Sequence, residues 1–343
     1  MFISYYHKNK TYFFFLPPTR AQATKELPLL QKEKMSSLTQ NAVGVEQVND
    51  PMPTFPSRVY FRQLLSGRDH SKMPDPQVPH QKLIFEYAKA MCNYQYLIGD
   101  KLTNECVVVD ACWDVAGILE CAKADGMKVT KGLCTHFHFD HVGGKVPKWM
   151  KRRIFRDAKN APSTVSGIKE VWSPGTRQGT TMPHTPCYIH RIELKKLSDD
   201  TGIPREDLTP LKEGSIVRLG EQSPLKMVVL HTPGHSQGSV CFLLANEEER
   251  DGVNGEAQNS IMQPVALISG DTVFAGSCGR TDLPESNKGD MQKSLLRLST
   301  DRALLPDKLP VFPGHAYGSR NFTTMEAERG GGMLHPIAID RLQ

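Results

Sequence analysis

The chain has 343 residues, of which 39% are hydrophobic and 23% are charged, and its formal net charge is +5. This is the composition of an ordinary globular protein that is long enough to bury a large core in one or two domains. The net charge is too small to argue for a nucleic-acid partner.

Residues 1–55 differ in kind from the rest of the chain. Their main apolar run, Tyr12 to Pro18, is too short to cross a bilayer, and a basic, polar stretch follows it. The segment is compatible with an organelle-targeting leader, a disordered tail, or an extension upstream of a start at Met35. Glu26 and Glu33 weigh against a transit peptide, since such leaders avoid acidic residues. We therefore expect an irregular or targeting leader over residues 1–55.

One domain is predicted over residues 56–343, and its first part alternates strands with a helix. Residues 93–100 and 105–110 are typical of two strands joined in a hairpin. Apolar residues at helical spacing predict a helix over 114–125, and residues 129–134 predict the next strand. Strand, helix and strand together indicate a βαβ-like unit.

A second block over residues 215–317 repeats this alternation, after an expected loop at 206–210. Its helix is predicted near Met291 to Leu298. Such a rhythm permits two facing sheets with helices outside, but it does not by itself require them.

The segment from Thr135 to Gly144 is the most informative stretch of the chain. It places His136, His138, Asp140 and His141 within six positions, and two glycines follow. Alternation along an extended backbone puts the first two imidazoles on one side. Imidazole and carboxylate are the ligands of zinc and of non-haem iron, so this spacing predicts a metal site.

Three later segments each end an apolar run with a ligand-type residue and a glycine. They are His231–Ser239, Ser269–Phe274 and Phe312–Tyr317. This is the pattern of a buried strand that leads into a surface loop, and such loops can bring distant ligands to one metal.

The Thr-His-x-His-x-Asp-His pattern, with the three later segments in order, resembles the signature of the metallo-β-lactamase superfamily. The similarity runs from about Arg62 to about Arg329. It implies an α/β fold, the four-layer αββα sandwich of that family. It also implies a ligand set: for a first metal His136, His138 and His235; for a second Asp140, His141 and His315; and Asp271 as the bridge.

The separation of His141 from His235 is longer than in compact thioesterase-like relatives, which predicts an insertion at about 145–212. Residues 145–177 carry nine Lys or Arg. They are compatible with a basic lid or groove for an anionic substrate, or with a solvated insertion. The same region contains His184, Cys187 and His190, which could suggest a third metal site. No fourth ligand is evident, so we do not predict one.

A divalent metal supplies hydrolytic chemistry without a nucleophilic side chain. It lowers the pKa of bound water from about 16 to about 7, which produces a metal-bound hydroxide at neutral pH. Asp271 would bridge the metals, and Asp140 would ligate and orient the hydroxide, so both are the predicted catalytic residues. The reaction class is then hydrolysis of an ester, thioester, amide or phosphoester.

The segment Ser277–Pro284 resembles the Cys-Gly-Arg-Thr-Asp segment of glyoxalase-II-like hydrolases and persulfide dioxygenases, which act on glutathione-linked sulfur compounds. Arg280 would either hold a substrate carboxylate or pair with Asp282. Tyr317 would either point its hydroxyl into the site or cap a strand. These two are the predicted substrate-binding residues.

The resemblance implies a metal-dependent hydrolase, acting on a thioester such as a hydroxyacylglutathione and using two divalent ions, zinc ahead of iron. The alternative is a persulfide dioxygenase with a single Fe(II) held by His136, His235 and Asp271. Only 28 residues follow His315, too few for the C-terminal helical domain of glyoxalase II. A non-catalytic binding module is a third reading, which seven intact ligands disfavour.

Eight cysteines without a CxxC pair, and no visible secretory signal, predict reduced thiols in a cytoplasmic protein. Mitochondrial or plastid targeting is the alternative. The expected partner is a small thiol-derived molecule, with neither nucleic acid nor membrane, and a homodimer is compatible with the sequence.

Overall fold

The computed structural model describes residues 3–7, 10–14, 51–72, 81–148, 163–173, 176–177, 180–181, 183–249, 260–318 and 320–342. The chain separates into two compact units, Met1–Val45 and Glu46–Gln343.

The first unit contains an antiparallel hairpin of β1 (Ile3–His7) and β2 (Lys10–Phe14). These ten residues are thus paired strands rather than irregular chain, in keeping with the strand preference of their tyrosines and phenylalanines. Residues 15–50 lie outside the described residues, and the targeting prediction for 1–55 stays a prediction.

The first sheet of the second unit has six strands in the order β13-β12-β7-β5-β4-β3. The expected hairpin, helix and strand are confirmed, with α3 (Val115–Ala124) connecting β5 to its parallel neighbour β7. Asp114 caps α3 by accepting a hydrogen bond from the Gly117 amide. The strands are β3 (Val59–Leu65), β4 (Tyr94–Asp100), β5 (Glu105–Val109), β7 (Lys128–Leu133), β12 (Cys187–His190) and β13 (Leu208–Leu211).

The second sheet also has six strands, in the order β14-β15-β16-β17-β18-β19. It is mostly antiparallel, but β17 and β18 pair in parallel. The chain segment between these two strands contains the predicted helix, which is α8 (Lys288–Thr300). The strands are β14 (Ile216–Arg218), β15 (Leu225–His231), β16 (Val240–Glu249), β17 (Ser260–Gly270), β18 (Pro310–Pro313) and β19 (Thr323–Thr324).

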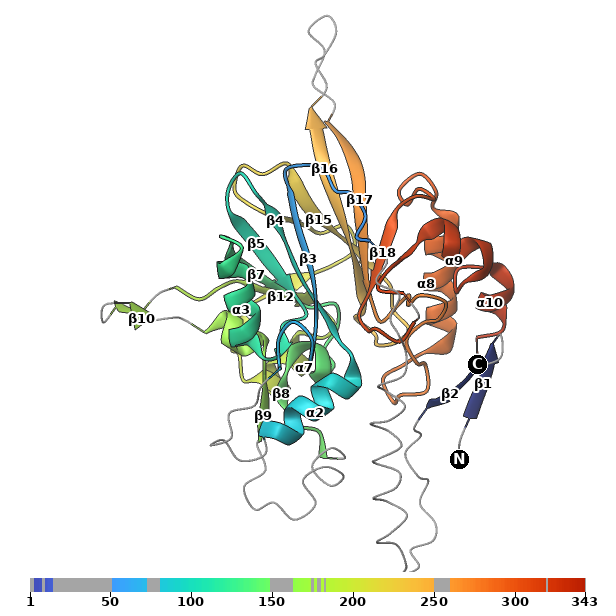
Figure 1. The fold of residues 1–343 in the computed structure, drawn as a ribbon, viewed down its shortest axis with the longest axis horizontal. Helices are drawn as coiled ribbons and strands as arrows, with labels where there is room; N and C mark the ends of the chain where they lie inside the picture. Colours follow the sequence, from blue (N-terminus) through green and yellow to red (C-terminus); the bar gives the residue numbers. More distant parts are fainter. Residues whose placement is uncertain are drawn as a thin grey trace, which may run out of the picture. The chain divides into compact units, whose positions relative to one another are not determined.

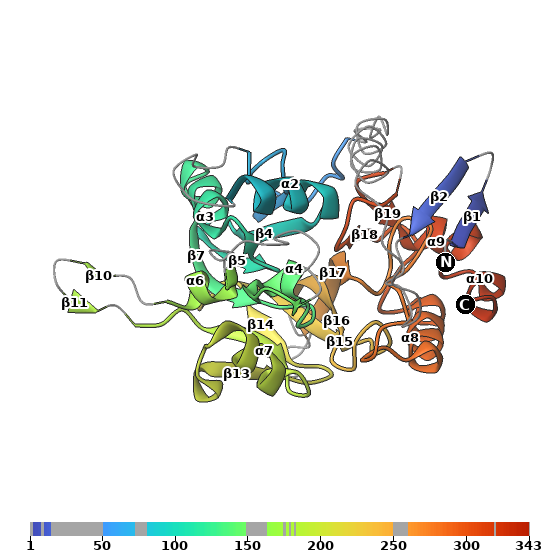
Figure 2. The ribbon, with the colours of Figure 1, turned by 90° about the horizontal axis from the view of Figure 1, so that it is seen from below.

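The two sheets face each other, and helices cover their outer faces (Figures 1 and 2). The inner core joins residues of both sheets, such as Ile98 and Val107 with Phe242 and Ile268. One outer core packs α3, α6 (Ile168–Trp172) and α7 (Leu194–Thr201) on the first sheet. The other packs α8, α9 (Met325–Gly331) and α10 (Pro336–Asp340) on the second. The predicted αββα sandwich is confirmed.

The remaining elements complete the described part of the second unit. They are α2 (Gln81–Met91), β6 (Cys112–Trp113), α4 (Phe139–Val142), β8 (Gly144–Lys145), β9 (Thr164–Gly167), β10 (Thr176–Arg177), β11 (Thr180–Thr181) and the 3-10 turn η1 (Arg205–Asp207).

The region expected as an insertion contributes two strands to the first sheet. The prediction of a loop at 206–210 was wrong. These residues belong to η1 and to the edge strand β13, in which Leu208 and Leu211 are buried. Pro210 is tolerated there because an edge strand leaves one side without a partner. Residues 149–162, which carry five of the nine basic residues of the segment 145–177, lie outside the described residues.

All eight cysteines are among the described residues, and each is a free thiol. Of the helices described, none has both the length and the apolar character that a membrane crossing requires.

Candidate metal centre

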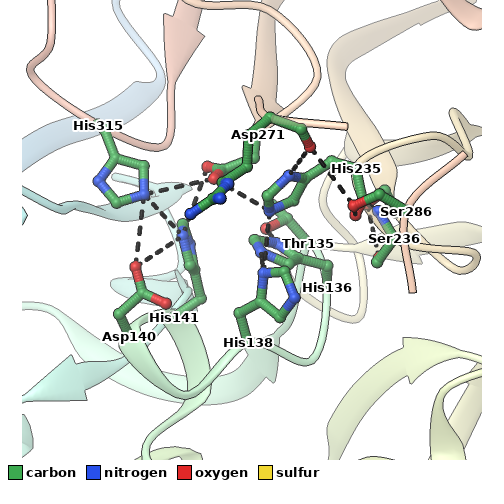
Figure 3. Close-up of polar contacts among 12 residues, drawn as sticks. Thr135, His136, His138, Asp140, His141, His235, Ser236, Asp271, Ser286 and His315 are labelled. Carbon is green, nitrogen blue, oxygen red and sulfur yellow. Dashed lines mark hydrogen bonds and ion pairs between the residues drawn. The ribbon is translucent and has the colours of Figure 1, made fainter. Parts of the chain in front are cut away.

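The side chains of the four ligand-bearing segments converge on one cluster (Figure 3). The first follows β7 and runs into α4, whereas the other three follow β15, β17 and β18 of the second sheet. All seven predicted ligands lie in this cluster, and six of them are buried, while His138 is half-buried.

Three imidazoles from the two sheets form the first triad. His138 Nδ1 lies 3.0 Å from His136 Nε2 and 2.9 Å from His235 Nε2. All three nitrogens lie within 4.8 Å of one another. Together they could hold one cation.

A second triad consists of Asp140, His141 and His315. The two imidazole Nε2 atoms lie 3.1 Å apart. Asp140 Oδ2 lies 3.6 Å from His141 Nε2 and 3.5 Å from His315 Nε2. These separations leave room for one ion at the centre of three ligand atoms, each about 2.1 Å away.

Asp271 lies between the two triads. Its Oδ2 is 3.4 Å from both His235 Nε2 and His315 Nε2, and its Oδ1 is 3.4 Å from His141 Nε2. This carboxylate reaches ligands of each triad, as a bridging residue must. Gly314 makes room for it, because a Cβ at that position would lie 2.4 Å from Asp271 Oδ1.

Each histidine of the cluster is held through the ring nitrogen that faces away from its triad. An acceptor there keeps the ring proton on the outward nitrogen, and this leaves a lone pair on the inward one. The acceptors are Thr135 Oγ1 for His136 (3.0 Å), Glu285 Oε1 for His138 (2.7 Å), Asp110 Oδ2 for His141 (3.0 Å), the Arg280 carbonyl for His235 (2.9 Å) and the Met91 carbonyl for His315 (2.8 Å).

Asp110 supports both triads, and the sequence reasoning did not identify it. Its carboxylate accepts hydrogen bonds from the Thr135 amide and hydroxyl, both at 2.7 Å, and from His141. The Thr135 hydroxyl in turn lies beside His136. A usable signal existed, because Asp110 directly follows β5, whose parallel neighbour β7 leads directly into the histidine motif.

Glu285 and the two carbonyl acceptors were also missed. Glu285 follows the Arg280 segment in a loop, and no spacing rule connects it with His138. A backbone carbonyl has no sequence signature, since every residue carries one.

The electrostatics of the cluster favour a cation. Burial lowers the pKa of His136 well below its usual range and that of His235 to about 4, so both rings are neutral at neutral pH. Burial opposes ionisation of Asp271, but His315 and His141 hold its pKa well below the usual range. Asp271 Oδ1 is buried without a hydrogen-bond donor. The neutral rings of His136 and His235, the anionic Asp271 and its Oδ1 without a hydrogen bond are groups that a divalent metal would satisfy.

The predicted substrate residues lie at the border of the cluster. Arg280 pairs with Asp282 through two contacts of 2.6 Å, which is one of the two expected alternatives. The ring of Tyr317 stacks on that of His315, with centroids 4.4 Å apart and an interplanar angle of 11°, and 42% of the residue is exposed.

The histidines and the cysteine of the insertion are not gathered at one point. His184 stacks on Trp172, the Cys187 thiol contacts the Ile168 carbonyl, and His190 stacks on His231.

Comparison with known proteins finds that residues 93–247 match the family model of the Metallo-beta-lactamase superfamily. An uncharacterised protein of Aquifex aeolicus is 29% identical over 230 residues, which cover 64% of this chain and 82% of the relative. The probable polyketide biosynthesis zinc-dependent hydrolase BaeB of Bacillus velezensis is 23% identical, with 70% and 80% covered. A hydroxyacylglutathione hydrolase of Maricaulis maris is 29% identical, with 70% and 68% covered.

Proposed function

Because residues 93–247 of this chain match the family model of the Metallo-beta-lactamase superfamily, we propose that the protein is a metal-dependent hydrolase of the glyoxalase-II-like group. Its preferred substrate would be a thioester such as a hydroxyacylglutathione. The observation that carries the proposal is the convergence of five inward-facing imidazoles and two carboxylates from four loops.

The proposed ligands divide as the two triads do. His136, His138 and His235 would hold one divalent ion. Asp140, His141 and His315 would hold another, with Asp271 between them. When bound, such ions lower the pKa of water to about 7 and polarise a substrate carbonyl.

Asp140 and Asp271 are the proposed catalytic side chains. Burial opposes the charged form of Asp140, yet His141 and His315 hold the pKa of this carboxyl below its usual range. It is therefore an anion at neutral pH and can accept a hydrogen bond that orients the attacking water. Asp271 presents Oδ1 without a donor of its own and would fix the position of both ions relative to the substrate.

The proposed substrate class rests on the relatives and on the border of the site. Two of the relatives described above carry hydrolase names, one of them for a hydroxyacylglutathione. Tyr317 offers an exposed aromatic face beside the second triad, and Arg280 offers a guanidinium whose partner Asp282 is exposed. A carboxylate of a glutathione-like substrate could displace that partner.

The alternative, a persulfide dioxygenase with one Fe(II), would use His136, His235 and Asp271 and leave His138 free. His138 Nδ1 instead faces both neighbouring imidazoles, and Glu285 holds its other nitrogen. This arrangement supports His138 as a ligand of the proposed hydrolase, while metal content is what separates the two readings.

The test is metal analysis of the purified protein together with two assays. For the hydrolase we expect zinc-like metal and release of free thiol from S-lactoylglutathione. One equivalent of iron with oxygen uptake on glutathione persulfide would establish the dioxygenase instead.

We predict that the double change His136→Ala, His138→Ala abolishes turnover and removes metal while the fold is partly kept. His184→Ala is the matched control, because that imidazole stacks on Trp172 away from the cluster and its loss should leave metal content unchanged. Turnover that persists in the double variant would contradict the proposal.

A further inference from the structure

Asn93 lies in direct contact with the second triad, although no motif draws attention to it. It precedes β4, is fully buried and pairs with His315 through its backbone. Its amide nitrogen Nδ2 lies 3.2 Å from Asp140 Oδ2, 3.4 Å from His141 Nε2 and 3.5 Å from His315 Nε2.

The orientation of this amide is set by Trp113. The indole Nε1 donates to Asn93 Oδ1 at 3.0 Å. An indole N–H can only donate, so the amide oxygen must face Trp113 and the NH₂ group must face the triad. The reverse orientation would bring two buried donors together. Trp113 is itself 2% exposed and packs edge-to-face on Phe139, which limits its movement.

An NH₂ group in this position works against a cation. It offers no lone pair to a metal, and it faces the same Asp140 oxygen and the same two imidazole nitrogens that a metal would use. Among the contacts of the described residues, no side-chain amide faces the inward nitrogens of the first triad, which contact one another and Asp271.

We propose that Asn93, oriented by Trp113, is a positioning residue that makes the two half-sites unequal, so that divalent metal fills the first triad before the second. The proposal rests on the ligand assignment of the proposed function. It adds an order of filling that the ligands alone do not imply.

The experiment is a Zn²⁺ titration of the metal-free, full-length protein in competition with a chromophoric chelator. The unchanged chain should bind zinc in two steps, the second weaker. His235→Ala should remove the stronger step and His315→Ala the weaker one, which assigns each step to its triad.

Two variants then test the role of the amide. Asn93→Ala removes the competing donor, and we expect the second step to tighten by roughly three- to tenfold, the equivalent of one hydrogen bond, with little change in the first. Trp113→Phe lets the amide turn its oxygen toward the ion, so the second step should tighten there as well. A purely structural role for either residue predicts the opposite, a weaker second step.

Asn93→Ser provides a smaller change if the alanine variant does not fold. Two equal steps in the unchanged protein, or a second step that is no tighter in the folded Asn93 and Trp113 variants, would overturn the inference and leave the proposed function intact. Absence of zinc binding in both steps would overturn both.

Discussion

A single carboxylate, Asp110, connects the two halves of the metal centre. Its backbone lies in the left-handed region with φ at 56°, a conformation uncommon for a non-glycine residue. The gain is that one buried side chain accepts three hydrogen bonds from the histidine motif. Strain of this kind persists where the surrounding contacts determine the conformation.

At the scale of single residues, we predict that Asp110→Asn weakens zinc binding by about 10- to 100-fold. The amide cannot accept all three hydrogen bonds, and His141 loses the anion that orients its ring. The measurement is chelator competition.

Asp100→Asn is the matched control. Asp100 is equally buried in the same sheet, but it binds Arg58 and Ser223 rather than a ligand. An equal loss of zinc affinity in both variants would mean that the effect of Asp110 is general destabilisation.

At the scale of elements, the region expected as an insertion supports the metal loops. Glu193 lies between β12 and α7, at the N-cap position of α7, and is 3% exposed. Its Oε1 accepts from the Ser236 hydroxyl at 2.5 Å and from the Gly238 amide at 2.9 Å. Gly238 permits this approach, since a Cβ there would lie 2.6 Å from Glu193 Cγ. The start of α7 therefore holds the loop that carries His235.

We predict that Glu193→Ala lowers the free energy of unfolding by about 1–3 kcal/mol, because two buried donors lose their acceptor. It should also weaken zinc binding at the first triad. Glu193→Gln keeps an acceptor oxygen and should retain most of both properties. Denaturant unfolding and zinc competition are the measurements.

The exposed Glu206→Ala change, in η1, serves as the control. Zinc affinity unchanged in Glu193→Ala would show that this glutamate stabilises the fold without positioning His235.

At the scale of the whole molecule, the proposed ions would cross-link the two sheets. His136, His138, Asp140 and His141 follow the first sheet, while His235, Asp271 and His315 follow the second. Ligands from both sides of the sandwich couple metal binding to the stability of the complete fold.

Removal of metal by a chelator should therefore lower the thermal unfolding midpoint by several degrees, since ligand at 100 times its Kd contributes about 2.7 kcal/mol. Differential scanning calorimetry with and without chelator measures the shift. The His136→Ala, His138→Ala variant should show a much smaller shift, and an equal shift in that variant would place the stabilising metal elsewhere.

Much of this molecule could be predicted from the sequence, because local patterns encode local structure. The hairpin, α3, β7 and α8 follow from alternation and helical spacing. The ligand segments were recognisable because each ligand stands at the end of an apolar run. The edge strand β13 was missed because its burial depends on β12 and not on its own short, proline-containing sequence.

Only the tertiary structure decided how the ligands are held and which neighbours they have. Asp110, Glu285, Glu193 and Asn93 act across 25 or more residues of chain, and the carbonyls of Met91 and Arg280 act through backbone atoms. A sequence pattern records the type and spacing of side chains along one segment. The direction in which a hydrogen bond points is set by the packing of segments that are distant in the chain, and no single segment carries that information.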